Sequence, residues 1–237
     1  MLEALLVGLF VGLQHALEID HVAAVTSMMS GQKSRLSIVK HGVAWGIGHA
    51  TTLLAVTLVI VATGQAINDS VAEWLEFAVG LMLVGLGIHV LWRMRRDRIH
   101  IHAHRHGDLQ LHLHFHSHAR DAAPHLESMH RHDHIRLPLR SMAIGTMHGM
   151  AGSAALIAVV AASFGNFTSA LVYVAIFGLG SIAGMALLSA IMSVPLAWSA
   201  RTMTITNVVA QSAIGILTIS VGLVLAYETK LHLLVAT

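Results

Sequence analysis

The chain has 237 residues, of which 55% are hydrophobic and only 11% are charged, and its formal net charge is +2. Soluble domains carry roughly 25% charged residues, so this composition, with a mean hydropathy of +0.71, excludes an ordinary soluble domain. The sequence contains no cysteine, which excludes disulfides and thiolate metal sites, so that any bound metal must use nitrogen or oxygen ligands.

Apolar segments long enough to cross a bilayer recur along the chain. Crossing about 30 Å of hydrocarbon takes roughly 20 helical residues. Six segments have this length, at residues 2–29, 40–61, 71–92, 138–163, 168–194 and 204–227. The first of them lacks the basic start and the short apolar region of a cleaved signal peptide, so we expect it to stay in the membrane. The sequence therefore predicts an all-α integral membrane protein with six transmembrane helices.

Lysine and arginine are concentrated in three of the connections between these segments. They lie between residues 33 and 40, between residues 93 and 140, and at Arg201, and only Lys230 lies elsewhere. By the positive-inside rule the three connections face the cytoplasm. We therefore expect a multi-pass protein of the cytoplasmic (inner) membrane with both termini outside.

The two halves of the chain resemble each other. QHALEIDHV around His15 aligns with HGMAGSAAL around His148, WGIGHATTLL aligns with FGLGSIAGMA, and GLMLVGLGI aligns with GILTISVGL. A unit of three spans ends on the side of the membrane opposite to its start, so the second copy must be inverted. We expect two inverted three-helix repeats at residues 1–94 and 138–237, a cytoplasmic loop at residues 95–137, and a substrate site near the bilayer midplane.

Titratable residues gather at one depth of the predicted spans. Each costs about 3 kcal/mol or more in hydrocarbon, so such residues tend to mark a site or an ion path. Counted along the helices from their cytoplasmic ends, the histidines of three different spans lie at similar depths. Imidazole and carboxylate ligands suit nickel(II), cobalt(II) and zinc(II). We therefore expect one metal site formed by His15, Asp20, His21, His49 and His148.

The spacing of His15 and His21 sets a condition on the first helix. Six residues of regular helix turn two side chains about 120° apart, so both cannot bind one ion. Either the helix unwinds near residues 16–19, or only some residues of HALEIDH bind the ion and the others hold those ligands in place without touching it. Glu18, which shares a helical face with His15, is equally consistent with ligation and with a structural or proton-handling role. A buried hydrogen-bonded network without metal is the alternative.

These residues carry a resemblance to a known family. The segment from His15 to His21 resembles the HxxxxDH signature of the nickel/cobalt transporter family. That family's second histidine motif is matched by Gly48, His49, Thr51 and Thr52. HGMAGSAAL and the six-helix length are similar to the urease-associated nickel permease branch, and the resemblance covers nearly all of the chain outside the central loop. It implies passage of nickel(II), with cobalt(II) as a second candidate ion, and no prosthetic group.

The sequence departs from the pattern of the family in two ways. The better-known eight-helix members carry HAxDADH where this chain has HALEIDH, so Glu18 and Ile19 bear on ion selectivity. A histidine-rich cytoplasmic loop is similar to that of related nickel and cobalt exporters. We expect an inward permease, and efflux with a metal-sensing loop is the alternative. Supporting roles near the site are expected for Glu18, His41, Thr51 and Thr52.

Other classes of function are not expected. The sequence has no GxxxxGK[ST] loop for ATP and no HExxH motif, and the sixth predicted span contains no histidine that could activate Ser153 of the fourth. We therefore expect a secondary transporter rather than an enzyme. Its expected partners are membrane lipid and the transported ion, with a cytoplasmic metallochaperone and a second copy of the chain as further candidates, and no nucleic acid.

Twelve of the 19 histidines lie in the central loop. In HIHAHRH and HLHFHSH they alternate with other residues, which is the period of a β-strand, and Gly107 and Asp108 between the runs favour a turn. One hypothesis is a β-hairpin in which each histidine of the first run faces one of the second. A disordered metal-binding tether and a solvated loop without function are the alternatives. The eight histidines are His100, His102, His104, His106, His112, His114, His116 and His118.

Overall fold

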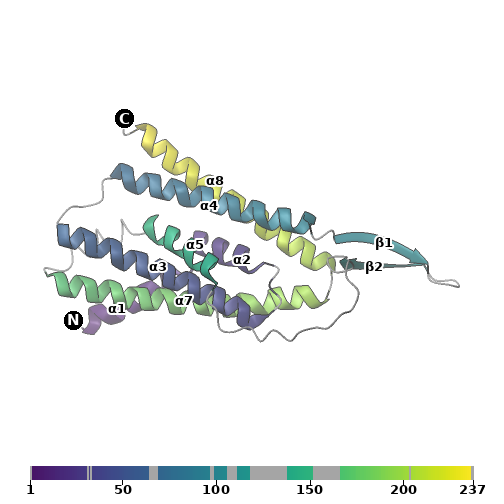
Figure 1. The fold of residues 1–237 in the computed structure, drawn as a ribbon, viewed down its shortest axis with the longest axis horizontal. Helices are drawn as coiled ribbons and strands as arrows, with labels where there is room; N and C mark the ends of the chain where they lie inside the picture. The colour runs from purple at the N-terminus through teal and green to yellow at the C-terminus, as the bar shows by residue number, and fades with distance from the viewer. Residues whose placement is uncertain are drawn as a thin grey trace.

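The structure is a computed structural model that describes residues 2–30, 32, 34–63, 69–96, 99–105, 111–117, 138–151, 166–202 and 204–235. Its helices are α1 (Leu2–His15), α2 (Ile19–Met29), α3 (Arg35–Thr63), α4 (Asp69–Arg96), α5 (Leu139–Ala151), α7 (Phe167–Thr202) and α8 (Thr204–Val235), and its strands are β1 (Ile99–Arg105) and β2 (Leu111–Ser117). The helices form an elongated bundle. The two strands project from one end of it, and α1 begins and α8 ends at the other (Figure 1).

The described helices have the length and composition of membrane spans. Four of them, α3, α4, α7 and α8, are long and apolar enough to cross a bilayer, and the bent pair of α1 and α2 raises the number to five. Large apolar side chains such as Phe10, Val59 and Ile216 are exposed on the outside of the bundle, where lipid would cover them. The chain is thus a multi-pass membrane protein. Of the predicted span at 138–163 only residues 138–151 are described, so the six-span count stays a prediction.

Two helices extend beyond the ends of the predicted spans. The helix over the fifth segment continues past residue 194 to Thr202, with Pro195 inside it. Proline removes one backbone N–H, and in a long apolar helix the neighbouring chain can compensate for the lost bond. The last helix likewise continues past residue 227 to Val235. In both cases hydropathy marks where the apolar run ends, whereas the hydrogen bonds of the helix extend further.

The helices pack in pairs that combine the two halves of the chain. α4 lies against α8 and α3 against α7, while the shorter helices α1 and α5 lie against α7 and α3 respectively. Buried side chains such as Trp45, Leu83 and Met185 fill the space between them. The interior of the bundle is therefore formed jointly by both halves.

Glycines allow α3 and α5 to approach closely. A Cβ atom at Gly48 would overlap the carbonyl oxygen of Met142, and one at Gly145 would overlap that of Trp45. The same reciprocal contact joins α1 and α7, because a Cβ at Gly12 would overlap the carbonyl of Phe177 and one at Gly180 that of Leu9. Small residues at such positions are what permits close backbone contact between membrane helices.

The two strands form an antiparallel hairpin. Its backbone register places His100 opposite His116, His102 opposite His114, and His104 opposite His112. This is the pairing that alternation in the sequence predicts. His106 and His118 lie outside the described residues, and metal binding by the hairpin stays a prediction.

The close contact of α3 and α5 predicts that Gly145→Ala lowers the melting temperature of the purified protein. Overpacking at such a site typically destabilises by about 1–3 kcal/mol, which corresponds to a loss of several degrees in a chain of this size. Gly85→Ala is the matched control, because no atom lies within 4 Å of a Cβ built there. Both variants gain the same helix propensity. Thermal unfolding in detergent is the measurement, and equal melting temperatures for the two variants would contradict the packing described.

Candidate metal site

The helix of the first span is interrupted at residues 16–18. The N–H of Leu17 donates to the carbonyl of Gln14 over 2.9 Å, and that of Glu18 donates to the carbonyl of His15 over 3.1 Å. These short turn bonds close α1, and a bond of 2.9 Å from the N–H of Val22 to the carbonyl of Glu18 opens α2. The two helices meet at 56°. Of the two alternatives for the spacing of His15 and His21, the unwinding of the helix near residues 16–19 is therefore present.

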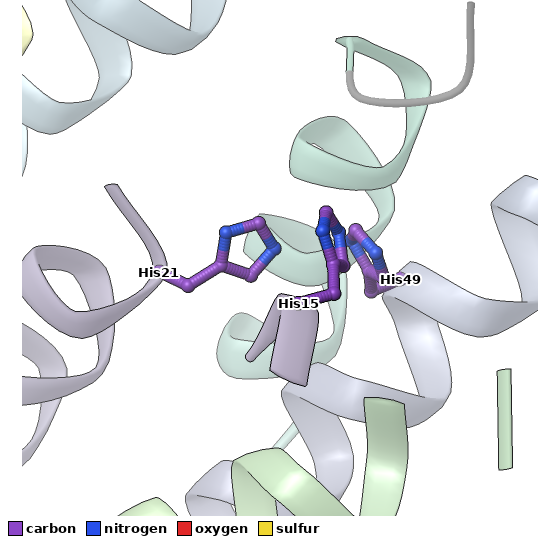
Figure 2. Close-up of side chains that lie close together, drawn as sticks. All are labelled: His15, His21 and His49. Atoms are coloured by element: carbon purple, nitrogen blue, oxygen red, sulfur yellow. The ribbon is translucent and has the colours of Figure 1, made fainter. Parts of the chain in front are cut away.

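The interruption brings three imidazoles together. His15 ends α1, His21 lies in the first turn of α2, and His49 lies in the middle of α3 (Figure 2). Their ring centroids are separated by 4.4 Å for His15 and His21, 5.3 Å for His15 and His49, and 5.2 Å for His21 and His49. One ring nitrogen of each lies within 4.8 Å of one on each of the others. The three rings could therefore hold one ion.

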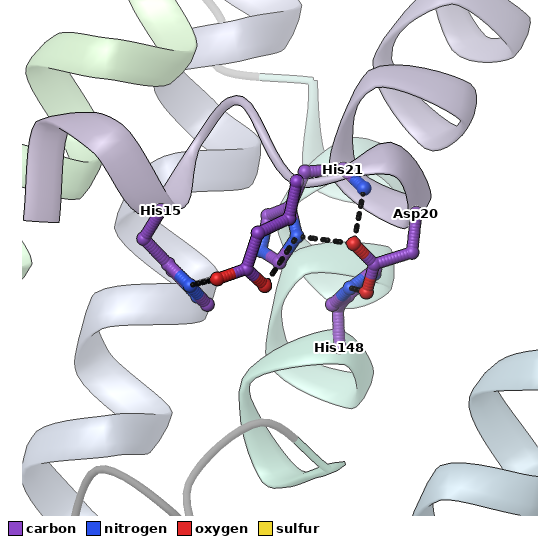
Figure 3. A network of polar contacts seen from close by, with 5 residues as sticks. His15, Asp20, His21 and His148 are labelled. Atoms are coloured by element: carbon purple, nitrogen blue, oxygen red, sulfur yellow. Dashed lines mark hydrogen bonds and ion pairs between the residues drawn. The ribbon is translucent and has the colours of Figure 1, made fainter.

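Asp20 connects this group to the second half of the chain. Its Oδ1 accepts hydrogen bonds from the backbone N–H of His21 over 2.8 Å and from Nδ1 of the same residue over 2.9 Å. Its Oδ2 lies 2.9 Å from Nε2 of His148 on α5 (Figure 3). Asp20, His21 and His148 form a second group with ligand atoms within 4.8 Å. His21 is common to both groups.

The imidazoles of the cluster are buried, and most of their nitrogens lack a partner. His21, His49 and His148 are at most 1% exposed. Nε2 of His21, both ring nitrogens of His49 and Nδ1 of His148 make no hydrogen bond within the described part of the chain. A buried polar atom without a partner costs roughly 1–3 kcal/mol. A divalent transition-metal ion would satisfy these lone pairs, so the residues present fit such an ion.

An open pocket leads to the cluster at the interruption. It has a volume of about 440 Å³ and is lined by Val11, Gln14, His15, Leu17 and Glu18. Glu18 is more than half exposed, and its Oε1 accepts a hydrogen bond of 2.7 Å from Nδ1 of His15. His15 thus lines the pocket and also contacts the rings of His21 and His49.

The structure brings the five residues of the predicted metal site together, and their role as ligands stays a prediction. The supporting roles expected for three residues of α3 also stay predictions. Nδ1 of His41 is 2.6 Å from the hydroxyl of Ser141, the hydroxyl of Thr52 donates to the carbonyl of Gly48, and Thr51 is exposed. These groups make no hydrogen bond to the cluster among the described residues.

Trp45 is a part of the site that the sequence did not single out. Its buried ring has centroid distances of 5.3 Å to His21, 5.5 Å to His148 and 6.4 Å to His49. It precedes His49 by four residues, so the two share a helical face, and this spacing was the available signal. The indole forms an apolar wall that keeps water from one side of the imidazoles.

No family model and no solved structure matches the chain. The urease accessory protein UreH of Bacillus sp. (strain TB-90) is 31% identical to it in an alignment of 222 residues that covers 87% of this chain and 83% of the relative. The similarity thus extends over most of both proteins. The chain therefore belongs to the UreH family, the urease-associated branch of the nickel/cobalt transporter superfamily.

Proposed function

We propose that the chain is a secondary transporter that carries nickel(II), with cobalt(II) as a second substrate, across the cytoplasmic membrane. The observation that carries the proposal is the set of buried imidazole nitrogens without partners, which lie at a helix interruption inside a membrane-spanning bundle. Imidazole is a ligand type that suits nickel and cobalt. Membership of the UreH family adds a second, independent reason to choose nickel.

The proposed ion path begins at the open pocket and continues to the buried histidines. The pocket reaches His15, which is partly buried, and His21 and His49 lie directly behind it. An interrupted helix inside a bilayer is tolerated where the protein surrounds it or where it lines a polar cavity. Transporters place their ion sites near the midplane at such interruptions. We propose the same role for the connection between α1 and α2, with the ion moving inward.

Glycine contacts support the proposed inverted repeat. In the aligned halves, Gly12 corresponds to Gly145, and Gly48 corresponds to Gly180. The contact of Gly48 and Gly145 between α3 and α5 therefore has its counterpart in the contact of Gly180 and Gly12 between α7 and α1. Exchanging the two halves turns one contact into the other.

The glycine contacts between α4 and α8 show the same correspondence between the two halves. Gly80 corresponds to Gly215, and Gly87 corresponds to Gly222. A Cβ at Gly80 would lie 2.8 Å from the carbonyl oxygen of Gly222, and a Cβ at Gly87 would lie 2.6 Å from that of Gly215. These two contacts also exchange when the halves are exchanged. The cluster, which contains His15 and the corresponding His148, then lies where the two proposed repeats meet.

The hairpin is the observation that keeps efflux as a second candidate. Residues directly opposite in an antiparallel pair have their Cβ atoms on one face of the sheet, about 5 Å apart. Three histidine pairs stand in this relation. On the cytoplasmic side they would collect ions and could serve an exporter as well as an importer. Cells that lack an exporter become metal-sensitive, whereas cells that lack an importer become metal-starved.

Nickel is expected to raise the melting temperature of the purified protein, and His49→Ala is expected to abolish most of this rise. A ligand present at 100 times its dissociation constant stabilises the folded state by about 2.7 kcal/mol, which amounts to several degrees. Each variant is compared with its own melting temperature without metal. Magnesium, which prefers oxygen ligands, is expected to give no rise.

The matched variant for this measurement is His89→Ala, which removes an exposed imidazole of α4 and is expected to keep the full effect of nickel. A nickel effect in His49→Ala as large as in the parent protein would show that the ion binds elsewhere.

Transport itself is tested by uptake of radioactive nickel into cells. We expect accumulation in cells that produce the parent protein and loss of accumulation to background in His15→Ala, Asp20→Ala and His21→Ala, because each removes a member of the cluster. His89→Ala again serves as the control, with membrane levels of every variant measured in parallel. Unchanged uptake in all three variants would refute the proposed site, and reduced accumulation with the parent protein would establish efflux instead.

A further inference from the structure

Two carboxylates lie beside the interruption, and each contacts the Nδ1 atom of a different histidine. Oε1 of Glu18 lies 2.7 Å from Nδ1 of His15, and Oδ1 of Asp20 lies 2.9 Å from Nδ1 of His21 (Figure 3). A carboxylate oxygen only accepts hydrogen bonds, so in each contact Nδ1 is the donor. Each neutral ring therefore carries its hydrogen on Nδ1, and its lone pair is on Nε2.

The Nε2 atoms are free to bind an ion. Nε2 of His21 is buried and has no partner within the described residues, and both ring nitrogens of His49 are in the same state. Nδ1 of His15 is engaged with Glu18, which leaves Nε2 as the ligand atom of that ring. One ring nitrogen of each of His15, His21 and His49 lies within 4.8 Å of one ring nitrogen of each of the others.

Asp20 already accepts three hydrogen bonds. It receives the backbone N–H of His21 over 2.8 Å, Nδ1 of His21 over 2.9 Å and Nε2 of His148 over 2.9 Å. Both lone pairs of Oδ1 and one of Oδ2 are used in this way. Carboxylates that accept the second N–H of a metal-binding imidazole commonly fix its tautomer and orientation without touching the metal.

The side chain of Glu18 makes no capping hydrogen bond to α2. Glu18 occupies the N-cap position of α2, where a side chain often accepts a backbone N–H, but it makes no such bond. It instead reaches back across the interruption to His15 and places its second oxygen 3.9 Å from Nδ1 of His21. The carboxylate of Glu18 therefore points toward the imidazoles of His15 and His21.

We propose that Glu18 is a positioning residue rather than a ligand. It holds the hydrogen of His15 on Nδ1, as Asp20 does for His21, so that the transported ion is bound by three neutral imidazoles, those of His15, His21 and His49. The inference rests on the proposed transport function. A set of three nitrogen ligands favours borderline divalent ions over magnesium and calcium, which prefer oxygen.

The test compares Glu18→Gln with Glu18→Ala in the full-length purified protein. The measured quantity is the nickel(II) concentration that gives half of the nickel-induced rise in melting temperature. Glutamine keeps an oxygen that accepts from Nδ1 of His15, so its half-maximal concentration should stay within about threefold of the parent, whereas alanine should raise it roughly 10- to 100-fold, as loss of such supporting partners typically does. Glu3→Ala, which removes an exposed carboxylate of α1 that lines neither the pocket nor the cluster, is the control and should match the parent.

Each outcome decides between the alternatives. Equal weakening by glutamine and alanine would overturn the proposal, because it would show that nickel needs the charged carboxylate as a ligand. An alanine variant that binds like the parent would overturn it as well. A parent protein with no nickel-induced rise would refute the proposed function itself, and this result is distinct from the other two. The melting temperature of each variant without nickel verifies that Glu18→Ala still folds.

Discussion

The interruption of the helix between His15 and Ile19 is the feature on which the rest of the site depends. A continuous helix would direct His15 and His21 to different sides, about 120° apart. With the chain turned by 56° over three residues, both rings instead lie beside His49 of α3. The backbone groups that the interruption releases are largely satisfied by short turn bonds within the connection. The cost of the unwound segment inside the bundle is kept low for that reason.

The close packing of the bundle brings the remaining groups to this connection. Because Gly48 and Gly145 let α3 and α5 approach at backbone distance, His148 can reach Asp20 from the other half of the chain. Trp45, on the helical face of His49, covers the buried side of the rings. The opposite side faces the pocket at Glu18. The cluster is thus covered by an aromatic ring on one side and borders an open pocket on the other.

Much of this arrangement could be predicted from the sequence, because the number of residues between two positions of a helix gives their separation in depth and angle. Apolar runs predicted the long helices, and the depth of the histidines predicted that His49 and His148 lie beside the first span. The six-residue spacing of His15 and His21 made an interruption of the helix one of two alternatives. Alternation made the hairpin one of three hypotheses for the loop.

What could not be predicted depends on three-dimensional contacts. Trp45 looks like any aromatic residue of an apolar run until its neighbours are known. His41 seemed close enough along α3 to support the site, but it bonds to Ser141 instead. Thr52 satisfies its hydroxyl on its own helix. The hydrogen bond from His15 to Glu18 crosses the interruption, so a regular helix could suggest the pair but not its role.

Anomalous scattering at the nickel absorption edge, from crystals of the nickel-bound protein, tests the central claim most directly. The proposed site predicts a peak within bonding distance of ring nitrogens of His15, His21 and His49, with Glu18 and Asp20 remaining on the Nδ1 atoms of their histidines. A peak confined to the histidine hairpin, or a cluster without nickel in crystals that contain it elsewhere, would contradict it.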